Sequence, residues 1–170
     1  AGADLDWMRT VAGFTREENL ADARALFDLY ETIDRSPKAV VAVVQGAALG
    51  GGAGLVAVAD VAVAEEGARF GFTEVRLGLV PAVISPFVVR KIGASAAREL
   101  FLTGERIPAS RAAAMGLVHR VVPLGGLDAA VDERVGELLK AAPGAVAAAK
   151  ALVRAVEARA PEAVRDLACE

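Results

Sequence analysis

Five glycines lie within the ten-residue stretch GAALGGGAGL, which runs from Gly46 to Leu55. Valines and alanines dominate the chain on both sides of it. Glycine costs roughly 0.5–1 kcal/mol relative to alanine inside a helix or strand. Five glycines in so apolar a setting therefore indicate a tight backbone turn, a ligand that approaches the backbone closely, or both.

Three kinds of ligand site compete to explain the glycine run. A phosphate-binding loop requires a lysine and a hydroxyl after the last glycine, and Leu55 follows here instead. A dinucleotide fingerprint requires glycines at the first, third and sixth places after a strand, and this spacing does not match. The third kind is a helix N-terminus whose free N–H groups hold an oxyanion that forms during a reaction. Close packing of a helix on a strand explains the glycines equally well.

Glu74 is the strongest candidate for a proton carrier. Apolar residues flank it in ARFGFT–E–VRLGLVP, and a partly desolvated carboxylate has a raised pKa that suits proton transfer near neutral pH. Its alternative roles are to stabilise a helix start or to pair with Arg76. Glu65 and Glu66 end a strand in polar surroundings, where we expect them to be solvated. The single histidine, His119, has no nucleophile near it in the sequence, which favours a surface or capping role.

The periodicity of apolar residues predicts the elements that position these groups. Helical spacing runs from Glu17 to Arg35. Ala39–Gln45 predicts a buried strand, and the glycine turn then leads into a buried helix that ends in Leu55–Ala59. Asp60–Glu66 predicts a second strand, and ARFGFTE a third, short one. A strand, a helix and a strand at this spacing predict a parallel layer and an α/β fold class.

The second half of the chain is predicted to be mainly helical. Gly93, Gly104 and Gly116 stand where glycines end helices, and Val118–Pro123 predicts a brief strand. From Leu124 onward the pattern is helical, with breaks at Pro143 and Pro161. We therefore divide the chain into a core, residues 1–123, and a helical region, residues 124–170. The wide apolar faces of that region are typical of helices that pack on another subunit, although covering their own sheet explains them equally well.

Composition excludes several classes of protein. The net charge is −3 and no basic block stands out, which argues against a nucleic-acid partner. The only cysteine, Cys169, excludes a zinc or disulfide framework within the chain and fits a reducing compartment, so we expect no metal site. Ala39–Ala59 is apolar enough for a membrane span, but its central glycines and the following Asp60 favour a buried strand and helix. Because the start AGADLDWMRT is acidic, we expect no signal peptide, no membrane and a cytoplasmic location.

Four segments together resemble the enoyl-CoA hydratase, or crotonase, superfamily. They are AGADL (residues 1–5), VQGAALGGGAGL (44–55), ARFGFTEVRLGLVPAVISPFVVRKIG (68–93) and LTGERIPASRAAAMGLVHRVVP (102–123). The resemblance covers nearly the whole chain in the family's order. It implies a spiral of β-β-α repeats with a helical C-terminal region that builds a homotrimer or a dimer of trimers. Because the family's AGAD falls well inside its domain, it also implies that the N-terminal part of the family domain is absent from this sequence.

The resemblance also implies a site. Members of the family bind an acyl-CoA thioester as substrate, and no separate cofactor is expected. By motif position, the N–H groups of Ala3 and Gly51 would form the oxyanion hole for the thioester oxygen, and Glu74 would be catalytic. Further residues are implied to bind the substrate and its CoA moiety: Ala1, Asp4, Leu5, Gly50, Gly54 and Val83.

Gly54 departs from the family pattern. Typical hydratases carry one glutamate at this place and a second at the place of Glu74, and they usually employ both to add water. With Glu74 alone, a proton shift between the α and γ carbons is simpler chemistry, which predicts a Δ3,Δ2-enoyl-CoA isomerase. Against this, TEVRLGLVPAVISPFVV is most similar to bacterial hydratases of leucine and acyclic-terpene breakdown, which act on branched methylglutaconyl-type esters. We therefore expect a hydratase, with an isomerase as the alternative and a non-catalytic acyl-CoA binder as the second alternative.

Overall fold

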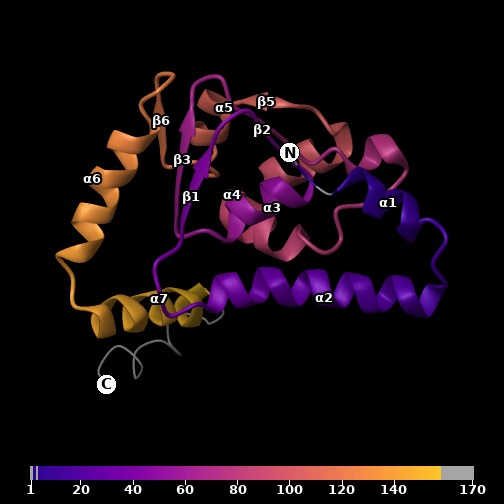
Figure 1. Ribbon diagram of the computed structural model, residues 1–170, viewed down its shortest axis with the longest axis horizontal. Coiled ribbons are helices and arrows are strands. Elements are labelled where there is room, and N and C mark those ends of the chain that lie inside the picture. Colours follow the sequence, from indigo (N-terminus) through magenta and orange to yellow (C-terminus); the bar gives the residue numbers. More distant parts are fainter. Residues whose placement is uncertain (1, 3, 158–170) are drawn as a thin grey trace.

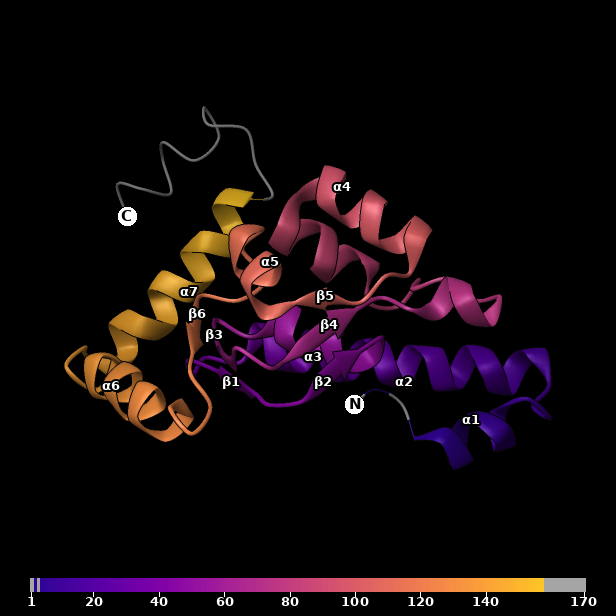
Figure 2. The ribbon, with the colours of Figure 1, turned by 90° about the horizontal axis from the view of Figure 1, so that it is seen from above.

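Two small sheets form the centre of the computed structural model, which describes Gly2 and residues 4–157 (Figures 1 and 2). One sheet is entirely parallel, with the order β1 (Val41–Val44), β3 (Val61–Glu65) and β6 (Arg120–Val122). The other has the order β2 (Ala47–Leu49), β4 (Arg69–Gly71) and β5 (Ile107–Pro108). In this second sheet β2 and β4 are parallel, whereas β4 and β5 are antiparallel.

Helices surround the two sheets. They are α1 (Leu5–Val11), α2 (Arg16–Arg35), α3 (Gly51–Val58), the 3-10 helix η1 (Glu74–Leu77), α4 (Ser85–Thr103), α5 (Ala109–Ala114), α6 (Leu127–Leu139) and α7 (Pro143–Glu157). The chain passes from the first sheet to the second and then into a helix twice: β1 and β2 lead into α3, and β3 and β4 lead through η1 into α4. This β-β-α repetition confirms the predicted α/β fold class and spiral.

Backbone hydrogen bonds fix the corner at which the chain changes sheets. Gly46 separates β1 from β2 with a positive φ of 65°, a conformation that favours glycine. Its carbonyl accepts a hydrogen bond from the N–H of Arg69 at 2.7 Å, which joins this corner to the start of β4. Successive turns of the spiral are therefore stacked in register. The end of β2, where α3 begins, lies beside the end of β4.

The apolar segment with the hydropathy of a membrane span lies only partly in the interior, and its strand β1, which was predicted to be buried, is incompletely covered: Val43 is 49% exposed. Ala53 of α3 is fully buried, as are Ala62, Val63 and Ala64 of the central strand β3. A parallel strand covered on both faces requires apolar residues at successive positions, which explains why these segments do not alternate. Among the described residues, no helix combines the length and apolarity needed to cross a bilayer.

The structure confirms most of the predicted elements and adds several short ones. The helix predicted for Glu17–Arg35 is α2, which begins with a capping box formed by Thr15 and Glu18. The break predicted at Gly93 is a kink inside α4, where φ is 78° and ψ is 158°. Four elements were not predicted: α1, β2, η1 and β5. Helices α6 and α7 confirm the helical pattern predicted after residue 124 and its break at Pro143, whereas the predicted break at Pro161 and Cys169 lie outside the described residues.

Candidate active site

The N-terminus of α3 is open. Gly50 caps it with φ 50° and ψ −119°, and no side chain satisfies the first turn. The N–H of Gly50 donates to the carbonyl of Gly71, at the end of β4, at 2.8 Å. Among Gly2 and residues 4–157, nothing accepts a hydrogen bond from the N–H groups of Gly51 and Gly52. Free donors and the positive end of a helix dipole are what an oxyanion site requires, and that this helix start binds an oxyanion stays a prediction.

Glu74 lies against this helix start. It is the first residue of η1, and its Oε1 atom would be 3.0 Å from a β-carbon placed on Gly50. Its Oε2 atom is buried without a hydrogen-bond partner in the described part of the chain. Burial raises the pKa of the Glu74 carboxyl, and its own backbone N–H opposes the shift. The predicted pairing with Arg76 is not among the ion pairs between described residues, so the carboxylate keeps a free oxygen for a ligand.

Tyr30, a residue that the sequence did not single out, contacts the same turn of α3. Its hydroxyl donates a hydrogen bond to the carbonyl of Gly51 at 3.0 Å, and its side chain is only 2% exposed. Burial raises the pKa of the Tyr30 hydroxyl, and the nearby charge of Glu74 raises it further. The one signal available in the sequence was a tyrosine in the apolar stripe of α2, where a hydroxyl needs a buried partner.

The space beside Gly54 is closed. A β-carbon on Gly54 would lie 2.5 Å from Cγ2 of Ile84 and 3.2 Å from Cε1 of Tyr30. Real β-carbons do not approach other atoms so closely, and Gly54 and Ile84 are both buried. A glutamate at position 54 therefore has no room in this packing, and Glu74 is the carboxylate that lies against Gly50.

The remaining predicted site residues differ in what the structure says of them. Gly2 approaches the end of β2, since a β-carbon there would lie 2.8 Å from the carbonyl oxygen of Leu49. Ala1 and Ala3 lie outside the described residues. Asp4 is exposed and caps α1, which Leu5 begins, by accepting hydrogen bonds from the N–H groups of Asp6 and Trp7. Val83 is partly buried and packs against the main core.

His119 takes part in the sheet rather than in the site. The imidazole Nδ1 atom of His119 accepts a hydrogen bond from the backbone N–H of Ala62 at 2.9 Å. The backbone N–H of His119 donates to the carbonyl of Ala62, also at 2.9 Å. Burial lowers the pKa of the imidazole, and the charges of Lys91 and Arg134 lower it further. A neutral histidine that satisfies a strand N–H fits the predicted capping role.

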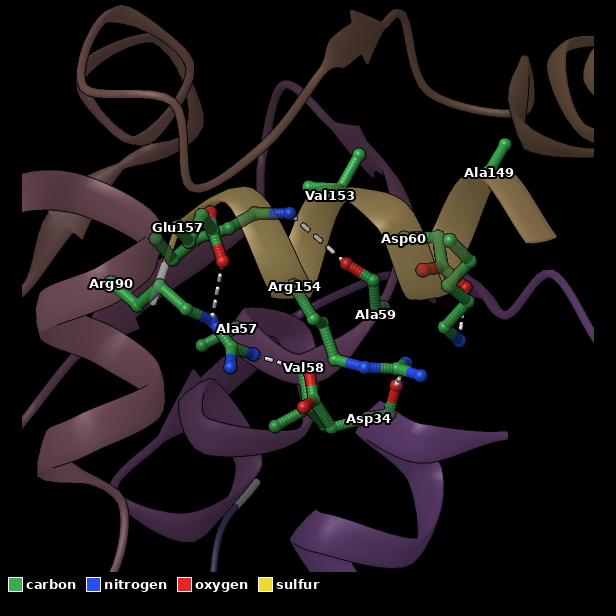
Figure 3. A pocket seen from close by; sticks show the side chains of 12 residues that line it. Asp34, Ala57, Val58, Ala59, Asp60, Arg90, Ala149, Val153, Arg154 and Glu157 are labelled. Atoms are coloured by element: carbon green, nitrogen blue, oxygen red, sulfur yellow. Dashed lines mark hydrogen bonds and ion pairs between the residues drawn. The ribbon is translucent and has the colours of Figure 1, made fainter. Parts of the chain in front are cut away.

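A cavity of about 420 Å³ lies at the opposite end of α3, where α7 passes the end of α2 and the first half of α4 (Figure 3). Its charged side chains are engaged with one another or with the backbone. Arg90 pairs with Asp34 and Glu157, Lys150 pairs with Asp60, and Arg154 donates to the carbonyl of Asp34. These contacts attach α7 to the core. None of the predicted site residues lines this cavity. We therefore place the candidate active site at the start of α3 and not in this cavity.

The sequence and the fold of the chain both match known proteins. Residues 1–169 match the family described as enoyl-CoA hydratase/isomerase. The chain belongs to this family. It is 39% identical over 156 residues to a putative enoyl-CoA hydratase of Thermus thermophilus, covering 92% of this chain and 62% of that protein.

Solved structures of family members have the same fold. An enoyl-CoA hydratase of Shewanella pealeana superposes with a TM-score of 0.94 at 41% identity, covering 99% of this chain and 63% of that one. AtuE of Pseudomonas aeruginosa superposes with a TM-score of 0.95 at 40% identity, with coverages of 99% and 66%. The chain thus spans less than two thirds of the length of each of these relatives.

Proposed function

We propose that this chain carries the reactive centre of an acyl-CoA lyase that hydrates an α,β-unsaturated enoyl-CoA through a thioester enolate. The observation that supports this most directly is the buried, unpartnered Oε2 atom of Glu74 beside the uncapped start of α3. A carboxylate with a raised pKa next to free N–H donors suits a reaction that moves a proton while negative charge develops on an oxygen.

In the proposed reaction one carboxylate serves both proton transfers. Glu74 accepts a proton from water as the water oxygen bonds to the β-carbon, and the C=C electron pair moves onto the thioester as an enolate. The N–H of Gly51 and that of Ala3 hold the enolate oxygen. The protonated Glu74 then delivers its proton to the α-carbon, which regenerates the carboxylate. The close approach of Gly2 to Leu49 supports the assignment of the second donor to the Ala1–Leu5 loop.

We propose a branched, methylglutaconyl-type ester as the acyl group. The support is the resemblance of Thr73–Val89 to hydratases that act on such esters, as in leucine degradation. Val83 would then line the acyl path, and Ala1, Asp4, Leu5 and Gly50 the path of the CoA moiety. A substrate role for Gly54 rests on the resemblance alone, because Ile84 and Tyr30 close the space beside it.

The closed space at Gly54 favours a second candidate, Δ3,Δ2-enoyl-CoA isomerisation. Because Ile84 and Tyr30 fill the volume beside Gly54, no second acid or base can stand there. Glu74 alone can remove a proton from the α-carbon of a 3-enoyl thioester and return it to the γ-carbon. This reaction requires no bound water.

Mass spectrometry in D₂O distinguishes these candidates. The intact protein is incubated with 3-methylglutaconyl-CoA, a linear 2-enoyl-CoA or a 3-enoyl-CoA, beside the Glu74→Gln variant. Glu66→Gln serves as the matched control, because Glu66 is an exposed glutamate at the end of β3. Addition of water that Glu74→Gln loses and Glu66→Gln keeps supports the hydratase. Double-bond migration with deuterium uptake and no added water supports the isomerase. Bound but unchanged esters contradict both and favour a non-catalytic acyl-CoA binder.

We also propose that the intact protein is a homotrimer or a dimer of trimers. Apolar side chains that the described chain leaves exposed support this, among them Leu20 and Leu29 on α2 and Leu139 on α6. Light scattering coupled to size-exclusion chromatography of the intact protein tests it, and a monomeric mass contradicts it.

A further inference from the structure

We infer that Tyr30 is a positioning residue of this site, whose hydroxyl holds the first turn of α3 so that its N–H groups stay aimed at the thioester oxygen. The inference rests on the proposed function of the α3 N-terminus as the enolate-binding site. The argument starts from the contact between the Tyr30 hydroxyl and the carbonyl of Gly51, at 3.0 Å.

The first turn of α3 needs an external anchor. Four of its residues from Gly50 to Gly54 are glycines, and glycine carries the largest loss of backbone entropy on folding. The Gly50 cap supplies no side-chain hydrogen bond. A turn of this composition is intrinsically loose, whereas an oxyanion site requires donors that are fixed before the reaction begins. Tyr30 supplies a fixed point from α2, 21 residues away in the chain.

The contact acts on the donors through the peptide plane. The carbonyl of Gly51 and the N–H of Gly52 belong to one planar peptide unit, so a donor that fixes the carbonyl also fixes the direction of that N–H. The N–H of Gly51 lies one Cα away, on the preceding unit. A hydrogen bond to the carbonyl also polarises the peptide and strengthens its N–H as a donor. Tyr30 therefore fixes the N–H of Gly52 directly and restrains that of Gly51 through the Cα atom that the two peptide units share.

The ring and the glycines depend on each other. A β-carbon on Gly51 would lie 2.9 Å from the Tyr30 hydroxyl, and one on Gly54 would lie 3.2 Å from its Cε1 atom. The ring therefore reaches the helix only because these positions are glycine. The ring also packs against Phe87, with 5.9 Å between the ring centroids, and this contact restrains the tyrosine itself.

Tyr30→Phe separates positioning from packing, because it removes the hydroxyl and keeps the ring. The matched control is Phe27→Leu, which alters an aromatic side chain of the same helix that packs on Phe87 but has no hydrogen bond to α3. The probe is cinnamoyl-CoA, whose absorption moves to longer wavelength when hydrogen bonds polarise its thioester carbonyl. Its spectrum at saturation, recorded directly after mixing, reports the donors whether or not the ester is turned over. Activity and its pH profile are measured in parallel.

We expect wild type and Phe27→Leu to give the full red shift, and Tyr30→Phe a clearly smaller one with a dissociation constant changed by less than about threefold. We expect kcat of Tyr30→Phe to fall about tenfold, the loss of one hydrogen bond's free energy, with KM and the acidic pKa of the profile unchanged. An unchanged red shift in Tyr30→Phe overturns the inference. If the wild type gives the red shift but no turnover, and Tyr30→Phe loses the red shift, the inference is supported while the proposed reaction fails. A wild type that gives no red shift, whether or not it binds the probe, overturns both.

Discussion

Ile84 occupies the volume that any side chain at position 54 would need. The two residues are 30 positions apart in numbering, yet a β-carbon on Gly54 would lie 2.5 Å from Cγ2 of Ile84. Ile84 is the N-cap residue of α4 and is only 3% exposed. The start of α4 therefore packs directly against α3, the helix that begins in the glycine run. The single-carboxylate character of the site is thus a matter of packing as well as of sequence.

Gly54→Ala tests this packing. We expect it to lower the free energy of unfolding by about 2 kcal/mol, because the new methyl group overpacks a full core. Gly136→Ala is the control, since Gly136 lies in α6 with open space around its α-carbon, and helix propensity there favours alanine by about 1 kcal/mol. Ile84→Ala combined with Gly54→Ala should be less destabilised than the sum of the single variants, as urea denaturation of all four proteins measures. Additive losses would contradict the contact.

Glu74→Gln is expected to stabilise the protein at neutral pH while it abolishes turnover. Burial raises the folded-state pKa of Glu74 above its ordinary value of 4.5, so the charged form is disfavoured in the folded protein. The free energies of unfolding of the wild type and of Glu74→Gln are therefore closest below pH 4.5. As the pH rises through the folded-state pKa, the wild type loses stability relative to the variant. Thermal melts between pH 4 and pH 8 measure the gap. For Glu66→Gln, at an exposed position, the difference in melting temperature from wild type should not grow with pH. If the melting temperatures of Glu74→Gln and wild type change in parallel with pH, the burial argument is refuted.

The parts of the fold that depend on local pattern could be predicted from the sequence. The apolar stretch Ala39–Ala59, with glycines at its centre and Asp60 after it, indicates a strand, a turn and a helix, and Gly93 indicates a helix break. Both signals lie within a few residues of the feature they describe. Glu74 was found in the same way, from its apolar neighbours. The three-residue strand β2 was not, since it exists only through its pairing with β4, 22 positions further along the chain.

The partners within the site could not be predicted, because they are tertiary contacts. Nothing in the sequence near Tyr30 indicates that its hydroxyl reaches Gly51, and nothing near Ile84 indicates that it limits Gly54. Helix α2 shows only an apolar stripe, which predicts that Tyr30 is buried but not what its hydroxyl contacts. Contacts of this kind depend on how the spiral stacks α2, α3 and α4 against one another.

His119→Ala is expected to destabilise the protein without changing turnover. The substitution leaves the N–H of fully buried Ala62 without the Nδ1 acceptor, a loss of about 2 kcal/mol. Because the folded-state pKa of His119 lies below its ordinary value of 6.5, this stability is present above pH 6.5 and is lost as the pH falls through the folded pKa. Denaturation at pH 8 and pH 5 should therefore show a smaller difference between variant and wild type at pH 5. A loss of kcat beyond that explained by unfolding would instead place His119 in the reaction.

Lys150→Met is expected to loosen α7 from the core. One oxygen of Asp60 accepts hydrogen bonds from the N–H of Val40 and from Nζ of Lys150, both at 2.7 Å, and the Lys150 side chain is 11% exposed. Removing the ammonium leaves a half-buried carboxylate without its counter-charge, which should lower the free energy of unfolding by about 2 kcal/mol.

Asp60→Asn in the Lys150→Met background should recover part of this loss, because it removes the uncompensated charge while an oxygen remains for the N–H of Val40. The control is Lys140→Met: its pair with Glu137 is exposed on both sides, so its loss should be below about 0.5 kcal/mol. Urea denaturation in low and high salt measures all of these variants. Equal losses for Lys150→Met and Lys140→Met would show that the ion pairs around the α7 cavity are surface contacts that do not hold the helix.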